Sequence, residues 1–363
     1  MSRKIPYIIL LILLASCTSE LPVTPDPMDQ EQEVPVQFYM SINPLENQES
    51  RAAIEETQLD VDSHVGIFAL EGNINANGDF NTTKDPTNKW SNENIRENFM
   101  NAEYVVKDFS IDHGYRKLEP TGTIGTYPSK GALQFYAYYP YSAEDITYEN
   151  LKSPKLKINI GNSIEDTPDY LYTGAAKSDT LRFKHALGRL NIYIYTSLDI
   201  PNMSIEQYPY INNISIKTLK DQNALLNLEN GNIESRNSIK NQKKSFKREF
   251  SLPDEDEDNS FFITSTTAES AKNIQGPVYS NMFVPSEVVI KDGEVIEQEV
   301  FIQLLQITIT SSYEDYVYYE ENKNVEKDIK NPTKTYDFNS IKIKLKKGEI
   351  TDLYIQYNPT PKQ

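Results

Sequence analysis

LRFKHALGRLNIYI, residues 181–194, is the stretch that decides the fold class. The apolar side chains of residues 181–187 mostly fall on odd numbers, whereas those of residues 190–194 fall on even numbers. Side chains of a strand alternate between two faces, so the stretch predicts extended structure with a change of face in the middle. We expect Gly188 to form a β-bulge, because one extra residue shifts the alternation by one.

Strand patterns also dominate the rest of the chain. An apolar run at residues 65–70 predicts a buried strand, and apolar residues alternate with polar ones in other stretches. These alternating stretches are residues 155–160, 301–309, 341–346 and 353–357. The chain holds 24 Tyr and 14 Phe against a single Trp, which suits β-structure. The sequence predicts an all-β protein built from antiparallel strands, with a sandwich architecture.

Composition sets limits on the kind of partner. With 363 residues the chain is long enough for two domains, and it carries 36 Lys and Arg against 53 Asp and Glu. This acidic balance argues against nucleic acid and against docking on anionic lipid headgroups. A single cysteine leaves no pair for a disulfide, so folding must depend on hydrophobic burial.

The amino-terminal residues have the layout of an export signal. Two basic residues are followed by an apolar run that is too short to span a bilayer. The run ends in Leu14-Ala15-Ser16-Cys17, which resembles a bacterial lipobox. That resemblance implies cleavage between Ser16 and Cys17 and acylation of the Cys17 thiol, which anchors the protein to outer-membrane lipid through its acyl chains. An ordinary signal peptide that ends near a cysteine is the alternative.

The segment that follows has no apolar periodicity. It is rich in Pro and acidic residues, which is typical of an extended linker. We therefore divide the chain into a signal peptide at 1–16, an acylated cysteine and flexible tether at 17–35, and two β-domains at 36–180 and 181–363.

Three local motifs occur in a characteristic order: FYAYYPY at 135–141, DYLYTGA at 169–175 and FKHALGRL at 183–190. With a lipobox ahead of them, they resemble the fimbrillin-like lipoproteins of the type V pilin superfamily. The resemblance implies structural roles for five residues of these motifs: Tyr138, Pro140, Phe183, His185 and Gly188.

The resemblance implies two transthyretin-like β-sandwich domains, exported to the outer membrane and the cell surface. It implies a pilus (fimbrial) subunit or an adhesin, whose partners are other fimbrillin-type subunits joined by β-strand addition, and a ligand on a host or bacterial surface. In such pilins a protease cuts after an arginine and releases an amino-terminal strand.

Arg51-Ala52 is the candidate for that cut, and an ordinary exposed loop arginine is the alternative. The released strand would include residues 36–42, in which Val36, Phe38 and Met40 share one face. The segment after the last predicted strand contains two prolines, which donate no ladder hydrogen bonds. This favours a tip, accessory or stand-alone adhesin over a polymerising stalk subunit.

The sequence does not suggest an enzyme, a cofactor or a metal. We interpret His185 as a structural side chain, and neither His64 nor His113 has metal ligands at suitable spacing. The acidic run at 254–259 lacks the glycine and glutamate of an EF-hand. A second function remains open, because tyrosines of the 135–141 motif on an exposed face would suit a glycan-binding lipoprotein of an outer-membrane uptake system.

Overall fold

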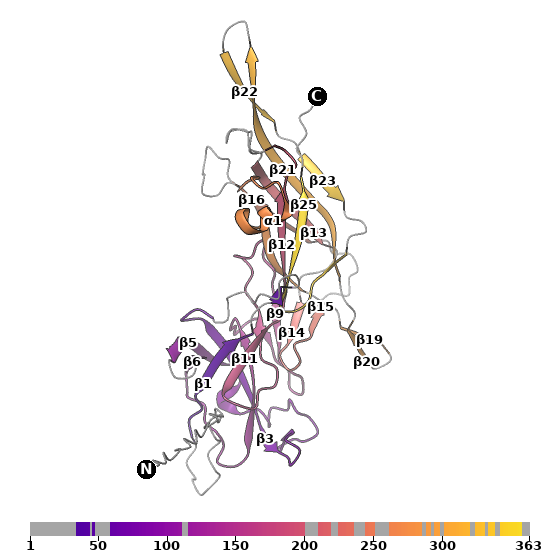
Figure 1. The fold of residues 1–363 in the computed structure, drawn as a ribbon. Helices are drawn as coiled ribbons and strands as arrows, with labels where there is room; N and C mark the ends of the chain where they lie inside the picture. Colours follow the sequence, from indigo (N-terminus) through magenta and orange to yellow (C-terminus); the bar gives the residue numbers. More distant parts are fainter. Residues whose placement is uncertain are drawn as a thin grey trace, which may run out of the picture.

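A computed structural model describes most of the two predicted β-domains. The residues it describes are 34–43, 46–47, 59–110, 115–199, 210–218, 224–235, 244–250, 261–284, 288–291, 294–297, 301–319, 324–330, 333–337 and 342–357. Nearly all regular structure in them is β-strand, so the predicted all-β class is confirmed. Figure 1 shows the early strands gathered in one half of the molecule and β25 in the other half.

The decisive stretch forms two strands in two different sheets. β11 (Thr180–His185) belongs to the first sheet, and β12 (Gly188–Tyr195) belongs to the second. The expectation of a bulge at Gly188 is therefore wrong. The apolar parity changes because the chain leaves one core for another, across a connector of two buried residues, Ala186 and Leu187. Gly188 is needed for close approach instead, since a Cβ there would lie 2.6 Å from the Lys346 carbonyl oxygen.

Seven strands of the first sheet close into a ring. In order around it, the strands are β3 (His64–Ile74), β5 (Ala102–Ser110), β6 (Tyr115–Pro120), β1 (Phe38–Ile42), β11, β10 (Leu171–Tyr172) and β7 (Ala132–Tyr139), which pairs with β3 again. Only β1 and β11 run parallel within this ring of described strands. A short strand, β4 (Phe80–Thr82), extends the edge of β3. This arrangement is barrel-like, so a sandwich is not confirmed for this part of the chain.

Alternation along the ring strands sorts side chains between two cores. Along β3, Val65, Ile67 and Ala69 point into the ring, whereas Phe68 and Leu70 pack outside it. The predicted buried strand at 65–70 is thus buried on both faces. The outer face is covered by the rest of the protein rather than by solvent, which explains why the run contains no polar residue.

The second part of the chain builds further sheets. One has the order β18 (Tyr279–Phe283), β12, β25 (Glu349–Gln356) and β2 (Glu46–Asn47). Another has the order β15 (Ile233–Ser235), β14 (Ala224–Asn227), β9 (Lys155–Ile158) and β8 (Ile146–Thr147). Because β9 pairs with β14, residues on both sides of the predicted division at 180/181 share a sheet. The division into two domains stays a prediction.

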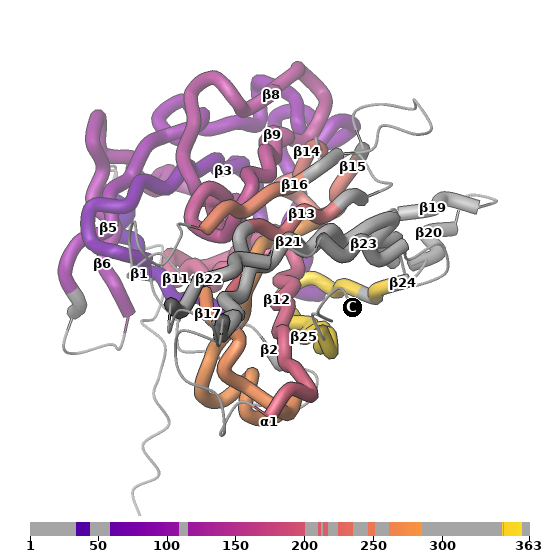
Figure 2. The backbone as a smooth tube through the Cα atoms, turned by 90° about the horizontal axis from the view of Figure 1, so that it is seen from above, coloured from indigo at the N-terminus to yellow at the C-terminus, as the bar shows by residue number. Residues whose placement is uncertain are grey.

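The longest described strand lies in a seven-stranded sheet. Its order is β16 (Lys244–Glu249), β13 (Tyr210–Thr218), β21 (Phe301–Tyr319) and β22 (Asn324–Lys330), with β17 (Phe261–Phe262) on β13, and β23 (Thr333–Asp337) and β24 (Lys342–Lys344) on β21. β19 (Val288–Lys291) and β20 (Glu294–Glu297) form a separate hairpin. Figure 2 shows β5 and β6 at one side of the molecule, away from the paired strands β12 and β25.

One helical segment interrupts the strands of the second part. α1 (Ala268–Ser270) continues directly into the π-helical turn η5 (Ala271–Gln275). Thr267 caps the start of α1, since its side chain accepts a hydrogen bond from the Ser270 N–H. No described helix is long and apolar enough to cross a bilayer.

Candidate strand-exchange site

β1 is one of the strands that form the wall of the ring, and its neighbours are β6 and β11. It pairs antiparallel with β6 through Phe38, Tyr39 and Met40, and parallel with β11 from Tyr39 to Ile42. The inward side chains of Phe38, Met40 and Ile42 are buried, and those between them are half-buried. The face predicted for this segment from alternation is therefore the face that fills the ring.

Phe38 is the centre of the ring interior. Its ring lies edge-on to three other aromatic rings, with centroid-to-centroid distances of 5.9 Å to Phe99, 5.2 Å to Tyr104 and 4.8 Å to Phe135. Edge-to-face geometry brings the positive rim of one ring to the negative face of the other, so these contacts add to the burial energy. Burial raises the pKa of Tyr104 to about 12, which indicates how little water reaches this core.

The chain on either side of β1 is also held by main-chain hydrogen bonds. The Val36 N–H donates to the Gly125 carbonyl at 2.9 Å, and the Tyr127 N–H donates to the Val34 carbonyl at 2.8 Å. At the other end, the Asn43 N–H donates to the Phe183 carbonyl at 2.9 Å. β2 then pairs parallel with the start of β25 in the second sheet. The amino-terminal segment thus contributes to both halves of the fold.

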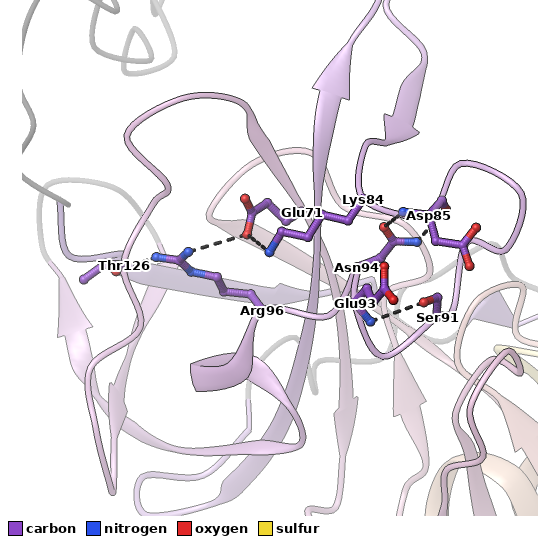
Figure 3. Close-up of polar contacts among 8 residues, drawn as sticks. All are labelled: Glu71, Lys84, Asp85, Ser91, Glu93, Asn94, Arg96 and Thr126. Carbon is purple, nitrogen blue, oxygen red and sulfur yellow. Dashed lines mark hydrogen bonds and ion pairs between the residues drawn. The ribbon is translucent and has the colours of Figure 1, made fainter.

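A polar cluster lies beside the segment that leads into β1. In Figure 3 the Arg96 guanidinium lies between Glu71 and Thr126. Arg96 Nη1 is 3.5 Å from Glu71 Oε2, and Arg96 Nη2 donates to Thr126 Oγ1 at 3.3 Å. Thr126 forms a β-bridge with Pro35, so this cluster braces the backbone beside which the segment enters the ring. Lys84 forms a second ion pair with Glu71 at 3.2 Å.

The loop on the other side of this cluster is ordered by one buried amide. Asn94 is fully buried, and its Nδ2 donates to the carbonyl oxygen of Asp85 at 2.8 Å (Figure 3). The same Nδ2 donates to the Asn88 carbonyl oxygen at 2.9 Å. The Asp85 N–H donates back to Asn94 Oδ1 at 2.9 Å. A hydrogen bond from Thr87 lowers the pKa of the Asp85 carboxyl. These bonds fix the loop as part of the scaffold.

The motif tyrosines from the FYAYYPY segment are core residues. Tyr136 and Tyr138 are both buried, and the Tyr138 hydroxyl donates to Asn101 Oδ1 at 2.7 Å. A Cβ at Gly66 would lie 2.1 Å from the Tyr138 ring, so the ring occupies the space that only glycine leaves. Pro140 follows through a cis peptide bond. Tyr136 and Tyr138 therefore form no exposed platform for sugar rings.

The FKHALGRL motif lies at the junction of the two sheets. Phe183 is buried inside the ring next to β1, and His185, the last residue of β11, is 4% exposed. His185 Nδ1 lies 2.8 Å from the Asp169 carboxylate, so two of the recognised motifs are joined by this pair. Within the described residues, the buried Nε2 of His185 has no hydrogen-bond partner.

Several predicted sites lie outside the described residues. These are Ser16, Cys17, Arg51, Ala52, His113, the acidic run at 254–259 and the segment after residue 357. Within the described residues, no group of three or more His, Cys, Asp and Glu side chains could hold a metal ion. His64 lies in an exposed pair with Glu103, with Nδ1 2.8 Å from Oε1.

Sequence reasoning missed one contact that joins the two halves. Trp90 Nε1 donates to Glu229 Oε2 at 2.8 Å, and Lys89 Nζ lies 2.7 Å from Glu229 Oε1. Glu229 follows β14, and the Trp90 ring packs on Tyr136 at 4.7 Å. The single tryptophan in a polar, turn-rich stretch was the one signal that this loop has a packing role.

Comparisons with known proteins agree with the resemblance. A family model described as fimbrillin-like matches residues 50–359. A search among curated proteins finds no match.

Solved structures are also similar. A candidate cell adhesion protein from Bacteroides ovatus has 13% identity and a TM-score of 0.45, with 90% of this chain and 93% of that chain covered. A candidate cell adhesion protein from Bacteroides fragilis has 11% identity and a TM-score of 0.42, with 91% and 94% covered. The fimbrial anchor protein Mfa2 from Porphyromonas gingivalis has 9% identity and a TM-score of 0.21, with 85% and 100% covered. Since all three TM-scores are below 0.5, the assignment rests on the family model.

Proposed function

Because the chain belongs to the fimbrillin-like family, we propose that it is a lipid-anchored tip or accessory subunit of a fimbrium, or an adhesin, that joins other subunits by β-strand exchange. Family membership supports a fimbrial-type protein at the cell surface that assembles with other subunits. The family is one of adhesion and structural proteins, so we propose that the protein acts by contact and not by catalysis.

The observation that carries the proposal is the position of β1. This strand comes from the segment that precedes Arg51, yet it completes the first ring between β6 and β11. Taking it away would leave unpaired main-chain groups on two strands and empty the space filled by Phe38, Met40 and Ile42. Such a vacancy has both requirements of strand addition, which are ladder partners for affinity and side-chain pockets for specificity.

Exchange needs one covalent step. Hydrolysis of the peptide bond between Arg51 and Ala52 would separate β1 from the rest of the chain, with water consumed and a carboxylate and an amine released. β1 would then be held only by its two ladders, its packing and the pairing of β2 with β25. A strand from another subunit with the same alternation could take its place. A covalently attached β1 would stay in the ring, so an uncut chain is assembly-incompetent.

Acylation of Cys17 would place the cut between the membrane and the folded protein. Before cleavage the acyl chains hold the whole protein at the outer membrane, and after cleavage they hold only the segment that contains β1. The state of Arg51 therefore decides whether the folded part stays anchored through its own lipid or through another subunit. We propose that the acylated, surface-exposed form is the precursor, which is cut before it joins a fimbrium.

The test begins with the native protein. Mass spectrometry of protein extracted from the cell surface is expected to show diacylglycerol and an acyl chain on Cys17, and a second population that begins at Ala52. An Arg51→Ala variant should yield only the acylated form. Recovery of the unmodified thiol would overturn the anchor, and recovery of only the acylated terminus from assembled fimbriae would overturn the maturation step.

A second test measures exchange directly. After cleavage at Arg51 and removal of the fragment in mild denaturant, a labelled peptide with the sequence of residues 36–42 should bind the remaining protein in a fluorescence polarisation assay. The matched control is the same peptide with Phe38→Asp, which places a charge in the apolar interior. Equal binding of the two peptides, or of neither, would contradict strand exchange.

A further inference from the structure

The described strands include a continuous line of two parallel pairs. β1 lies parallel to β11, and β12 lies parallel to β25. The two-residue β2–β25 pairing is the only other parallel pair in the part of the chain that the structure describes. Since β11 and β12 are consecutive in sequence, the two parallel pairs are linked end to end. Figure 1 shows β1 and β11 in one half of the molecule, and β12 and β25 in the other half.

The directions of the first pair set how it responds to a pull. The carboxyl ends of β1 and β11 both lie at the junction, where the Asn43 N–H donates to the Phe183 carbonyl. A pull on the amino-terminal side of β1 draws this strand away from the junction, while β11 is held at the junction by β12. Parallel strands pulled from opposite ends slide along each other, so all four registered pairs from Tyr39–Thr180 to Ile42–Phe183 are loaded together.

The second pair has the complementary arrangement. The amino end of β12 lies at the junction. The carboxyl end of β25 lies at the opposite end of this pair, where the Tyr357 N–H donates to the Tyr195 carbonyl at 2.8 Å. A pull on the carboxyl-terminal side of β25 slides it along β12. Seven registered pairs, from Arg189–Ile350 to Tyr195–Gln356, are then loaded together.

Side chains also oppose sliding in the second pair. Asn191 lies opposite Asp352, and its Nδ2 donates to Asp352 Oδ1 at 3.0 Å. Tyr193 lies opposite Tyr354, and their rings stack at 5.2 Å. Displacement by one residue would break both contacts and place each side chain on the wrong face.

Helix η5 adds a third restraint to β25. Lys272 Nζ lies 2.7 Å from Asp352 Oδ2, and the Asp352 side chain is 1% exposed. The ion pair raises the pKa of Lys272, so the lysine is charged at neutral pH. Sliding of β25 would take the buried Asp352 carboxylate away from the partly exposed Lys272, and a buried charge without its partner is costly.

The connector between the pairs is short and held in place. The Ala186 N–H donates to the Tyr170 carbonyl at 2.8 Å, and the Leu187 carbonyl accepts from the Gly348 N–H at 2.9 Å. Both connector residues are fully buried. A pull therefore passes from β11 to β12 without first extending a loop.

We propose that β1–β11 and β12–β25 form a load-bearing line, in which a pull along the molecule is carried by shear of two parallel strand pairs. Its use on a cell rests on the proposed function, since in an uncut, lipid-anchored adhesin the anchor and a bound surface ligand would pull from the two sides. The loading geometry of the strands does not depend on that role. Hydrogen bonds loaded together resist rupture far better than bonds loaded one after another, although each contributes little at equilibrium.

The experiment stretches single molecules in optical tweezers with two attachment geometries for the same strand pair. The background is the secreted-length chain with Cys17→Ser and a carboxyl-terminal tag, which leaves no native thiol. Lys184→Cys is exposed on β11 before the junction, so pulling between it and the tag shears β12 against β25. Asp199→Cys is exposed beyond the far end of β12, so pulling there unzips the same pair. Equal urea midpoints would show that both variants fold alike.

The expected result is a rupture force severalfold higher for Lys184→Cys than for Asp199→Cys at the same loading rate. The first pair gives an independent comparison with an amino-terminal tag, in which Lys184→Cys shears β1 against β11 and Ser178→Cys unzips it. Equal rupture forces in shear and in unzipping would overturn the proposal that these strand pairs bear load. A strong shear response together with failed peptide exchange would overturn the proposed function and leave the line standing.

Discussion

Replacing Phe38 by Ala tests whether β1 is a structural part of the ring. The side chain is fully buried and makes three edge-on ring contacts. Truncation of a buried Phe to Ala costs about 3–5 kcal/mol, and the lost ring contacts place this site in the upper half of that range. We expect the free energy of unfolding to fall by about 4 kcal/mol, a large share of the ~5–15 kcal/mol that a folded domain has.

The assay is urea unfolding of the uncleaved protein, followed by the fluorescence of Trp90, the only tryptophan, which is buried against the outer side of the ring. The matched control is Tyr39→Ala, an aromatic truncation on the half-buried outer face of the same strand, which should cost clearly less. A loss below about 1.5 kcal/mol for Phe38→Ala, half or less of the usual cost of truncating a buried Phe, would refute the reasoning, as would equal losses for both variants.

Three further changes probe the scaffold around the ring. Gly66→Ala places a Cβ in the ring of the buried Tyr138, so overpacking should lower the unfolding free energy by about 1–3 kcal/mol or more in urea unfolding. Glu229→Ala leaves the Trp90 N–H without its acceptor, and we expect a loss of about 1–3 kcal/mol with a red shift of tryptophan emission. Asp179→Asn removes a carboxyl whose pKa is raised by burial, so it should stabilise the protein at pH 7 by a fraction of the ~1.4 kcal/mol that one pKa unit represents.

Each of these changes has its own control. For the glycine, Gly122→Ala adds a Cβ in open space and should be nearly neutral, so similar losses at both positions would contradict the steric argument. For the glutamate, Glu234→Ala removes an exposed partner of Lys155 and should cost less. For the aspartate, the folded pKa lies above the ordinary value of 3.8, so ionisation destabilises the folded state as pH rises through this range. The advantage of Asp179→Asn should therefore vanish at low pH, and an advantage that persists there would rule out ionisation as its cause.

Alternation predicted much of the strand content, because it reports burial on one face at a time. Leu156 and Ile158 are buried while Lys155 and Lys157 are half-exposed, as the period of two requires. Ile355 and Tyr357 are buried on one face of the last strand. The same logic placed Phe38 and Met40 together on an inward face. These patterns are local, so a single sequence is enough to find them.

Pairing between distant strands was not predictable from those patterns. The change of parity near Gly188 has two solutions, a bulge within one sheet or a step between two sheets, and both give the same alternation. Only the position of Lys346 and the rest of the second sheet distinguishes them. For the same reason, the sequence did not show that β1 lies parallel to β11 or that β3 and β7 close the ring. Those features depend on contacts between segments far apart in the chain.

The parallel pairing of β1 with β11 also dictates an order of events during synthesis. Tyr39 emerges early, but its partner Thr180 follows only after every other strand of the ring has been made. Contacts of such long sequence separation form late, because a long loop must close before they stabilise anything. Until then the ladder edge of the first strand that pairs with β11 stays open, which exposes the nascent protein to pairing with other chains.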